Sequence, residues 1–115
     1  MLNLLRFREV ADYTASPELA PATTIRGVDA YRRYLDAARP FVEAAGGELV
    51  FLGRGGPVLI GQPEERWDAV LLVKQRSVAD FMAFASNEGY LKILGHRTAA
   101  LEDSRLLPMI ETDAL

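Results

Sequence analysis

Hydrophobic residues follow two different periods along this chain, and together they predict alternating strands and helices. Residues 2–8 ("LNLLRFR") and 66–75 ("RWDAVLLVKQ") are short, mostly apolar stretches typical of strands. Residues 27–47 instead repeat apolar side chains at helical spacing from Val28 to Val42, and two glycines close the segment. The first half of the chain is therefore expected to fold as strand, long loop and helix.

The second half repeats this scheme with an additional strand. Residues 48–61 ("ELVFLGRGGPVLIG") have two β-rich halves around "GRGG", which predicts a hairpin turning at these glycines. Ser77, with an acid three residues later, predicts a helix start, and Asn87 predicts the start of a second helix through residue 103. Residues 104–111 ("SRLLPMIE") are expected to form the last strand.

The resulting order, β-α-β-β-α-β, is that of the ferredoxin-like plan. We therefore expect residues 1–115 to form one α+β domain, in which an antiparallel sheet carries the helices on one face. No internal repeat or low-complexity segment argues for a second domain.

The strands are apolar on both faces, which has consequences for assembly. Residues 69–73 are apolar at every position, and so are residues 49–52 and 58–60. Because successive side chains point to opposite sides of a strand, the face without helices is also apolar. A patch of this size exceeds what monomers usually expose. The sequence therefore predicts a two-fold homodimer with its sheets face to face, a dimeric α/β barrel.

Composition excludes several classes of function. The chain has 13 Lys and Arg against 16 Asp and Glu, a net charge of −3, which argues against nucleic-acid binding. It has no cysteine, so disulfides, thiolate metal sites and cysteine nucleophiles are excluded. Neither a secretory signal nor an apolar run long enough to span a bilayer is present, and we expect a cytoplasmic protein without membrane contact.

Five stretches together resemble the domain-of-unknown-function 1330 family over almost the whole chain: "MLNLLRFREVADY", "AYRRYLDAARP", "GGELVFLGRG", "WDAVLLVKQ" and "YLKILGHRTAALEDSRLLPM". The resemblance implies membership of the dimeric α+β barrel superfamily, with the ferredoxin-like fold and two-fold sheet packing. That superfamily includes cofactor-independent monooxygenases, muconolactone isomerase and chlorite dismutase-like haem proteins, so the fold does not fix the function.

The resemblance also implies a small cavity between sheet and helices in each subunit. The positions that it places beside this cavity are Asn3 on the first strand, Asp12 and Tyr13 in the following loop, Trp67 and Asp68 at the third strand, and His96 and Arg97 on the last helix.

His96 and Arg97 are the candidate catalytic residues. An imidazole titrates near neutral pH and suits a general base, yet ideal helix geometry places His96 opposite the apolar stripe. Arg97 sits beside the stripe and can reach the cavity rim. With Asp103 and Arg105 it could hold an anionic group, or these residues could form an intrachain salt bridge.

The candidate ligand-binding residues also have structural alternatives. The Asn3 amide could orient a substrate carbonyl or bond loop backbone. Asp12 and Tyr13 open the long loop, where Tyr13 could donate a proton, close over a ligand or anchor the loop by packing. Trp67 could line the cavity or pack in the core.

No metal or cofactor is expected, because the chain has one histidine, no cysteine and no carboxylates at ligand spacing around that histidine. Haem with His96 as axial ligand is suggested only by superfamily analogy. The leading hypothesis is a cofactor-independent enzyme (monooxygenase-, isomerase- or lyase-like) acting on a small metabolite. The alternatives are a non-catalytic small-ligand-binding dimer and a purely structural dimer.

Overall fold

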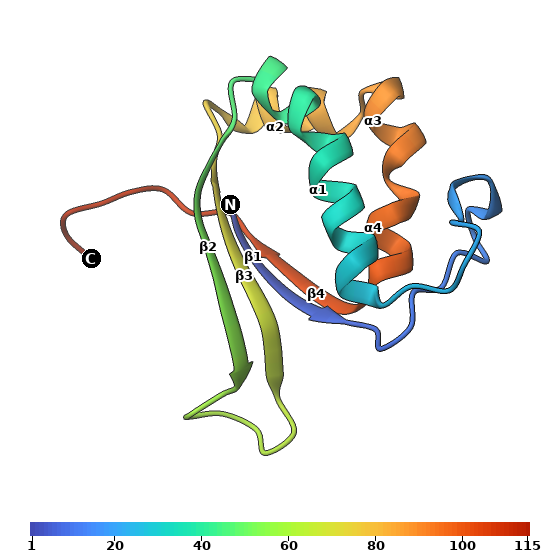
Figure 1. Cartoon of the computed structure of the whole chain (residues 1–115). Helices are drawn as coiled ribbons and strands as arrows, with labels where there is room; N and C mark the ends of the chain where they lie inside the picture. The colour runs from blue at the N-terminus through green and yellow to red at the C-terminus, as the bar shows by residue number, and fades with distance from the viewer.

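A computed structural model describes residues 1–115 and contains one antiparallel sheet of four strands in the order β2-β3-β1-β4. Figure 1 shows the helices gathered on one side of this sheet. None of the helices is long and apolar enough to cross a membrane. The elements are β1 (Leu2–Phe7), the 3₁₀ helix η1 (Pro17–Leu19), α1 (Gly27–Ala44), β2 (Glu48–Pro57), β3 (Arg66–Lys74), α2 (Val78–Ala85), α3 (Glu88–Ile93), α4 (Gly95–Ala100) and β4 (Leu101–Leu107).

Strand register decides which side chains face the helices. On β1, Leu5 pairs with Ala69 of β3 and Ser104 of β4, and its side chain is fully buried. Because side chains alternate along a strand, Leu4 points to the other face, which no helix covers. The sheet therefore has a covered face that builds the core and an open face.

Both predicted helix starts in the second half are confirmed. The Ser77 hydroxyl oxygen accepts a hydrogen bond from the backbone N–H of Asp80 at the start of α2. The Asn87 side chain accepts one from the backbone N–H of Tyr90 at the start of α3. Each bond satisfies a donor that has no partner in the first turn of a helix.

The predicted hairpin turn at "GRGG" is wrong. β2 continues through these glycines, and the connection to β3 is formed by residues 58–65 instead. A Cβ added at Gly55 would lie 2.3 Å from the carbonyl oxygen of Trp67 on β3. Glycine is needed here because the two strands approach closely, and not because the chain reverses. Leu59 and Ile60, expected in a strand, lie almost fully exposed in the connection.

The predicted helix over residues 87–103 is also corrected. It divides at Leu94 into α3 and α4, and β4 begins at Leu101, three residues earlier than expected. A Cβ at Gly95 would lie 2.4 Å from the Ser16 hydroxyl oxygen. Glycine at this position therefore leaves the space that the loop beside η1 occupies. β4 ends before Pro108, which has no N–H to donate to the ladder.

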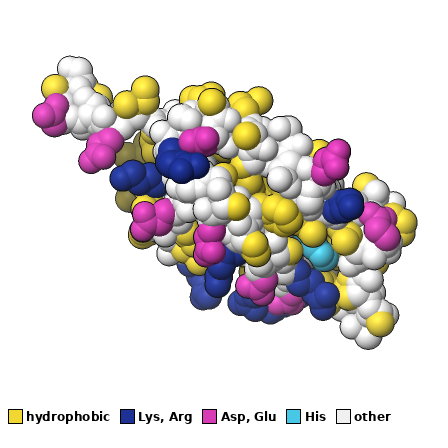
Figure 2. All heavy atoms as spheres, turned by 90° about the horizontal axis from the view of Figure 1, so that it is seen from above, with side chains coloured by type: hydrophobic (Ala, Val, Ile, Leu, Met, Phe, Trp, Pro, Cys, Tyr) yellow, Lys and Arg dark blue, Asp and Glu magenta, His cyan; other side chains and the backbone are white.

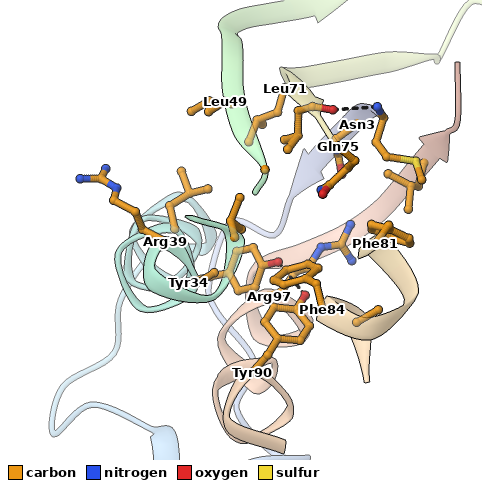
Figure 3. A pocket seen from close by; sticks show the side chains of 18 of the residues that line it. Asn3, Tyr34, Arg39, Leu49, Leu71, Gln75, Phe81, Phe84, Tyr90 and Arg97 are labelled. Atoms are coloured by element: carbon orange, nitrogen blue, oxygen red, sulfur yellow. Dashed lines mark hydrogen bonds between the residues drawn. The ribbon is translucent and has the colours of Figure 1, made fainter. Parts of the chain in front are cut away.

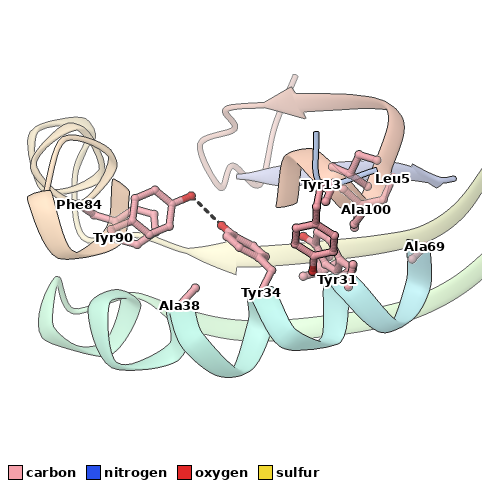
Figure 4. Close-up of a cluster of buried hydrophobic side chains, with 13 residues drawn as sticks. Leu5, Tyr13, Tyr31, Tyr34, Ala38, Ala69, Phe84, Tyr90 and Ala100 are labelled. Carbon is pink, nitrogen blue, oxygen red and sulfur yellow. Dashed lines mark hydrogen bonds between the residues drawn. The ribbon is translucent and has the colours of Figure 1, made fainter. Parts of the chain in front are cut away.

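The core lies between the covered face of the sheet and the helices and is rich in tyrosine (Figure 4). Three fully buried alanines, Ala30, Ala99 and Ala100, lie on α1 and α4. Their small side chains allow close helix packing. The remaining members of the buried cluster are Leu5, Tyr13, Tyr31, Tyr34, Ala38, Ala69, Leu71, Phe84, Tyr90 and Leu101.

Candidate functional site

A cavity of about 780 Å³ lies between the covered face of the sheet and the helices (Figure 3). Sixteen of the 24 residues that line it are hydrophobic, so its walls favour an apolar occupant. The polar side chains among the lining residues are therefore few, and the position of each one matters for what the cavity can bind.

One wall is aromatic. The hydroxyl groups of Tyr34 on α1 and Tyr90 on α3 form a hydrogen bond of 2.7 Å. The ring of Tyr90 also packs against Phe84, with 4.3 Å between the centroids. Burial, the Tyr90 hydrogen bond and neighbouring tyrosines raise the pKa of Tyr34, so its hydroxyl stays protonated at neutral pH. The pair gives the wall a fixed shape and satisfies its own polar atoms.

Arg97 reaches the same cavity from α4, where its guanidinium lies among the lining side chains (Figure 3). The ion pairs of the chain involve six other arginines, and no carboxylate lies within ion-pair distance of Arg97. Tyr31 lies beside it: burial raises the pKa of Tyr31 to about 12, and the Arg97 charge opposes part of that shift. The cavity thus holds a cation without an acidic partner next to a protonated phenol.

Two amides also line the cavity, together with the polar or charged residues Arg39, Glu43, Glu48 and Ser104. Asn3 on β1 pairs across the ladder with Leu71 and Leu106, and all three line the cavity. Gln75, which follows β3, also lines it, and its side-chain oxygen is buried without a hydrogen-bond partner. Asn3 can therefore present donors and an acceptor to an occupant from the floor of the sheet.

His96 lies outside this cavity. Its Nδ1 is 2.8 Å from the Tyr13 hydroxyl, and the two rings meet edge to face. Burial and then the charge of Arg33 lower the pKa of His96, so the imidazole is largely neutral at pH 7. Burial raises the pKa of Tyr13. Since successive helical residues point about 100° apart, Arg97 can face the cavity while His96 holds the loop that follows β1.

Asp12 and Trp67 lie outside the cavity as well. The Asp12 carboxylate accepts hydrogen bonds from the backbone N–H and hydroxyl of Thr14, and these bonds lower its pKa. Trp67 is buried beneath the guanidinium groups of Arg6 and Arg105, at 5.8 and 5.2 Å from its ring centroid. Of the six candidate residues, only Asn3 and Arg97 therefore line the cavity.

The acid–base cluster that follows Arg97 in sequence is separate from it. Arg105 forms an ion pair with Asp103 at 2.7 Å, and both lie on β4 rather than at a helix end. Arg97 therefore acts without these two residues. Nowhere in the chain do three potential metal ligands come together.

Residues 19–109 match the model of a family described as a domain of unknown function (DUF1330). The chain belongs to the DUF1330 family. Its fold resembles two crystal structures of the protein RPA0582, each 34% identical in sequence. The methylated protein has a TM-score of 0.83, with 98% of this chain and 81% of that chain covered.

The second structure is described as a protein of unknown function from Rhodopseudomonas palustris and a structural genomics target. It has a TM-score of 0.80, with 96% of this DUF1330 chain and 81% of that chain covered. Among proteins with curated descriptions, no significant match was found. The comparisons thus support an α+β fold and a family, and the chemistry has to be inferred from the cavity.

The sequence alone did not indicate the aromatic wall of this DUF1330 domain. Tyr31 and Tyr34 lie in the helical stretch 27–47 and Tyr90 in the stretch after Asn87, and none of them was named as a candidate. A usable signal was present, because tyrosines on the buried stripe of a helix bring hydroxyl groups that need partners or a cavity.

Proposed function

We propose that this DUF1330 domain binds a small organic anion with a partly apolar body, and that Arg97 holds the carboxylate of that ligand. The observation that carries the proposal is a guanidinium without an acidic partner in a cavity with mostly hydrophobic walls. A charge in such surroundings is costly unless it is paired. Arginine binds a carboxylate through two parallel hydrogen bonds, which compensates this cost.

The rest of the cavity suits the body of such a ligand. Its volume of about 780 Å³ lies within the range of small-molecule pockets. Phe81, Phe84 and Tyr90 offer rings for stacking against an aromatic or branched apolar group. Asn3 lies on the sheet side and can hydrogen-bond a carbonyl or hydroxyl.

Thermal unfolding with matched ligand pairs tests this proposal. Benzoate, indole-3-acetate and octanoate are compared with benzamide, indole-3-acetamide and octanamide, which keep the body and remove the charge. The acids should raise Tm and the amides should not, because only the acids pair with Arg97. Arg97→Leu should abolish the difference, whereas the control Arg39→Leu, an exposed lining residue, should retain it. Equal shifts for acids and amides would contradict the role of Arg97.

A second candidate function is a cofactor-independent enzyme of the monooxygenase, isomerase or lyase type. The observation that favours it is the phenol of Tyr31 beside the guanidinium of Arg97, since the two could hydrogen-bond the same oxygen of a bound substrate. We infer that Arg97 and Tyr31 would then be the catalytic pair, with His96 outside the site. Tyr31→Phe should still bind the acids but stop any conversion seen by proton NMR. Conversion at an unchanged rate would contradict this assignment.

We also propose that the domain has the ferredoxin-like plan and pairs with a second copy through the open face of its sheet, as a dimeric α/β barrel. The strand order and the helices on one face support the plan. Part of the open face is apolar, with Leu2 paired to Leu72 and Leu107 and Leu4 paired to Val70, whereas charged residues follow it on β1 and β4.

The exposed area also supports a dimer. The chain exposes 7915 Å², which is roughly 1,700 Å² more than a compact monomer of 12.7 kDa would expose. A standard interface hides about 800 Å² per partner, so the excess is large enough for one. The radius of gyration, 15.0 Å, likewise exceeds the value of about 13 Å for a compact domain of this length.

Sedimentation velocity tests the dimer. The wild type should sediment as a dimer at micromolar concentration, and Leu72→Glu should sediment as a folded monomer because it places a charge in the apolar interface. Val10→Glu, at an exposed position in the loop after β1, is the control and should remain dimeric. A wild type that stays monomeric would refute the barrel, and the ligand proposal would be unaffected.

A further inference from the structure

The C-terminal segment, residues 108–115, forms no helix or strand and extends away from the domain; we call it the C-terminal arm. It leaves β4 after Leu107 and runs away from the helices and the other strands (Figure 1). Figure 2 shows it standing apart from the body at the upper left. Its hydrogen bonds run only between Thr112 and Ala114, within the arm itself. No hydrogen bond therefore ties it to the rest of its own subunit.

The arm nevertheless carries large apolar side chains beside Glu111 and Asp113. Met109 is 50% exposed and Ile110 is 92% exposed, and Leu115 has no cover at all. Segments that remain free in solution are usually poor in large aliphatic side chains, because the burial of such side chains lowers the free energy. Pro108 favours an extended backbone at the base of the arm. An extended segment with apolar side chains and no internal partner is suited to lie along another surface.

We propose that the C-terminal arm packs against a second copy of this chain, so that two subunits exchange arms. This inference rests on the dimer proposed above. Leu107, the last residue of β4, pairs with Leu2, whose side chain lies on the same open face as Leu72. The arm therefore starts at the border of the open face and continues away from the helices, toward the side on which the second copy would lie.

A two-fold axis makes this arrangement reciprocal, since the arm of each subunit meets the same surface of the other. It also accounts for the excess area, to which both the open face and the arm contribute. An arm folded back on its own sheet would cover the open face and compete with the dimer. The direction of the arm in Figure 1 is opposite to such a fold.

Photo-cross-linking identifies the partner of the arm directly. The chain has no cysteine, so Ile110→Cys can be labelled at one position with benzophenone maleimide. Labelled chains are mixed with wild-type chains that carry a mass tag, and the mixture is irradiated. The proposal predicts a covalent product between labelled and tagged chains. Val10→Cys, labelled in the same way, lies in the loop beyond β1 and should give none. Cross-links from Ile110→Cys that stay within one chain would overturn the proposal.

A truncation measures how much the arm contributes. A chain that ends at Pro108 keeps every strand, helix and core residue, so it should fold. Its dimer dissociation constant, measured by sedimentation, should be at least ten-fold higher than that of the full chain. An unchanged constant would overturn the arm exchange and leave the dimer intact. A full chain that is monomeric throughout would overturn both, so the two failures are distinguishable.

Discussion

The unpaired guanidinium in the cavity has a consequence that needs no ligand to be known: Arg97→Leu should make the empty protein more stable. Leaving a polar group partly buried without its partner costs about 1–3 kcal/mol. Arg97 is half-buried and none of its side-chain nitrogens is both buried and without a partner, so the lower end of that range, about 1 kcal/mol, applies. The substitution also removes a favourable cation from the last turn of α4, about 0.3–1 kcal/mol. The expected net gain is below about 1 kcal/mol, or less than roughly 4 °C in Tm for a domain of this size.

Urea and thermal unfolding without ligand measure this change. Arg105→Leu is the matched control, because it removes the same side chain from a site where the guanidinium already has an ion-pair partner. Arg105 pairs with Asp103 and covers the ring of Trp67, so its loss should destabilise the protein by about 0.5–1.5 kcal/mol. The two substitutions are thus expected to have opposite signs.

The reasoning would be refuted if Arg97→Leu lowered the free energy of unfolding by 1 kcal/mol or more. Arg97 would then stabilise the fold by packing, through its aliphatic stem and its contact with Tyr31. Its presence would no longer indicate that the cavity binds an anion. A gain in stability accompanied by loss of the carboxylate-dependent Tm shift would show that the residue serves binding at the expense of the fold.

Two further predictions concern the core and the loop anchor. Leu5→Ala should cost about 3–5 kcal/mol in urea unfolding, since the side chain is fully buried between sheet and helices; a cost below 1 kcal/mol would mean that the core has collapsed to fill the space. The pKa of His96 is lowered in the folded protein, so the unfolded chain binds the proton more tightly. Stability is then complete above the unfolded pKa of about 6.5 and decreases as pH falls toward the folded pKa. His96→Gln should flatten this decrease between pH 7 and 5, and equal slopes in both proteins would contradict the anchoring of Tyr13 by a neutral imidazole.

The features of the fold that were predicted correctly are those decided by neighbours in sequence. Ser77 and Asn87 begin helices because their side chains reach a backbone N–H three residues ahead, an interaction that local spacing determines. The glycines of "GRGG" are compatible both with a turn and with two strands in close approach. The carbonyl of Trp67 across the ladder decides between these, and only the folded sheet brings it there.

The same distinction applies to the candidate site. Asn3 could be assigned a direction from strand alternation, and Arg97 from its place beside a helical stripe. The aromatic wall joins α1 to α3, and the Tyr34–Tyr90 hydrogen bond spans 56 residues of sequence. Trp67 was expected to line the cavity or pack in the core; it is buried, and the Arg6 and Arg105 guanidinium groups lie over its ring. Alternation along a strand cannot indicate which side chains will cover a residue.

His96 and Arg97 show which kind of residue to examine for function. By residue type, histidine is the stronger catalytic candidate. In the structure its Nδ1 bonds the Tyr13 hydroxyl and its ring packs on that of Tyr13, so its role in the fold accounts for its presence. Arg97 follows it directly, turns into the cavity and forms no ion pair there, although Glu43 and Glu48 also line the cavity. A side chain whose hydrogen bonds and packing are satisfied within the fold does not indicate a ligand. A charged side chain without an ion-pair partner among apolar groups does indicate one. The unpaired charge therefore makes Arg97, and not His96, the residue through which a ligand should be sought.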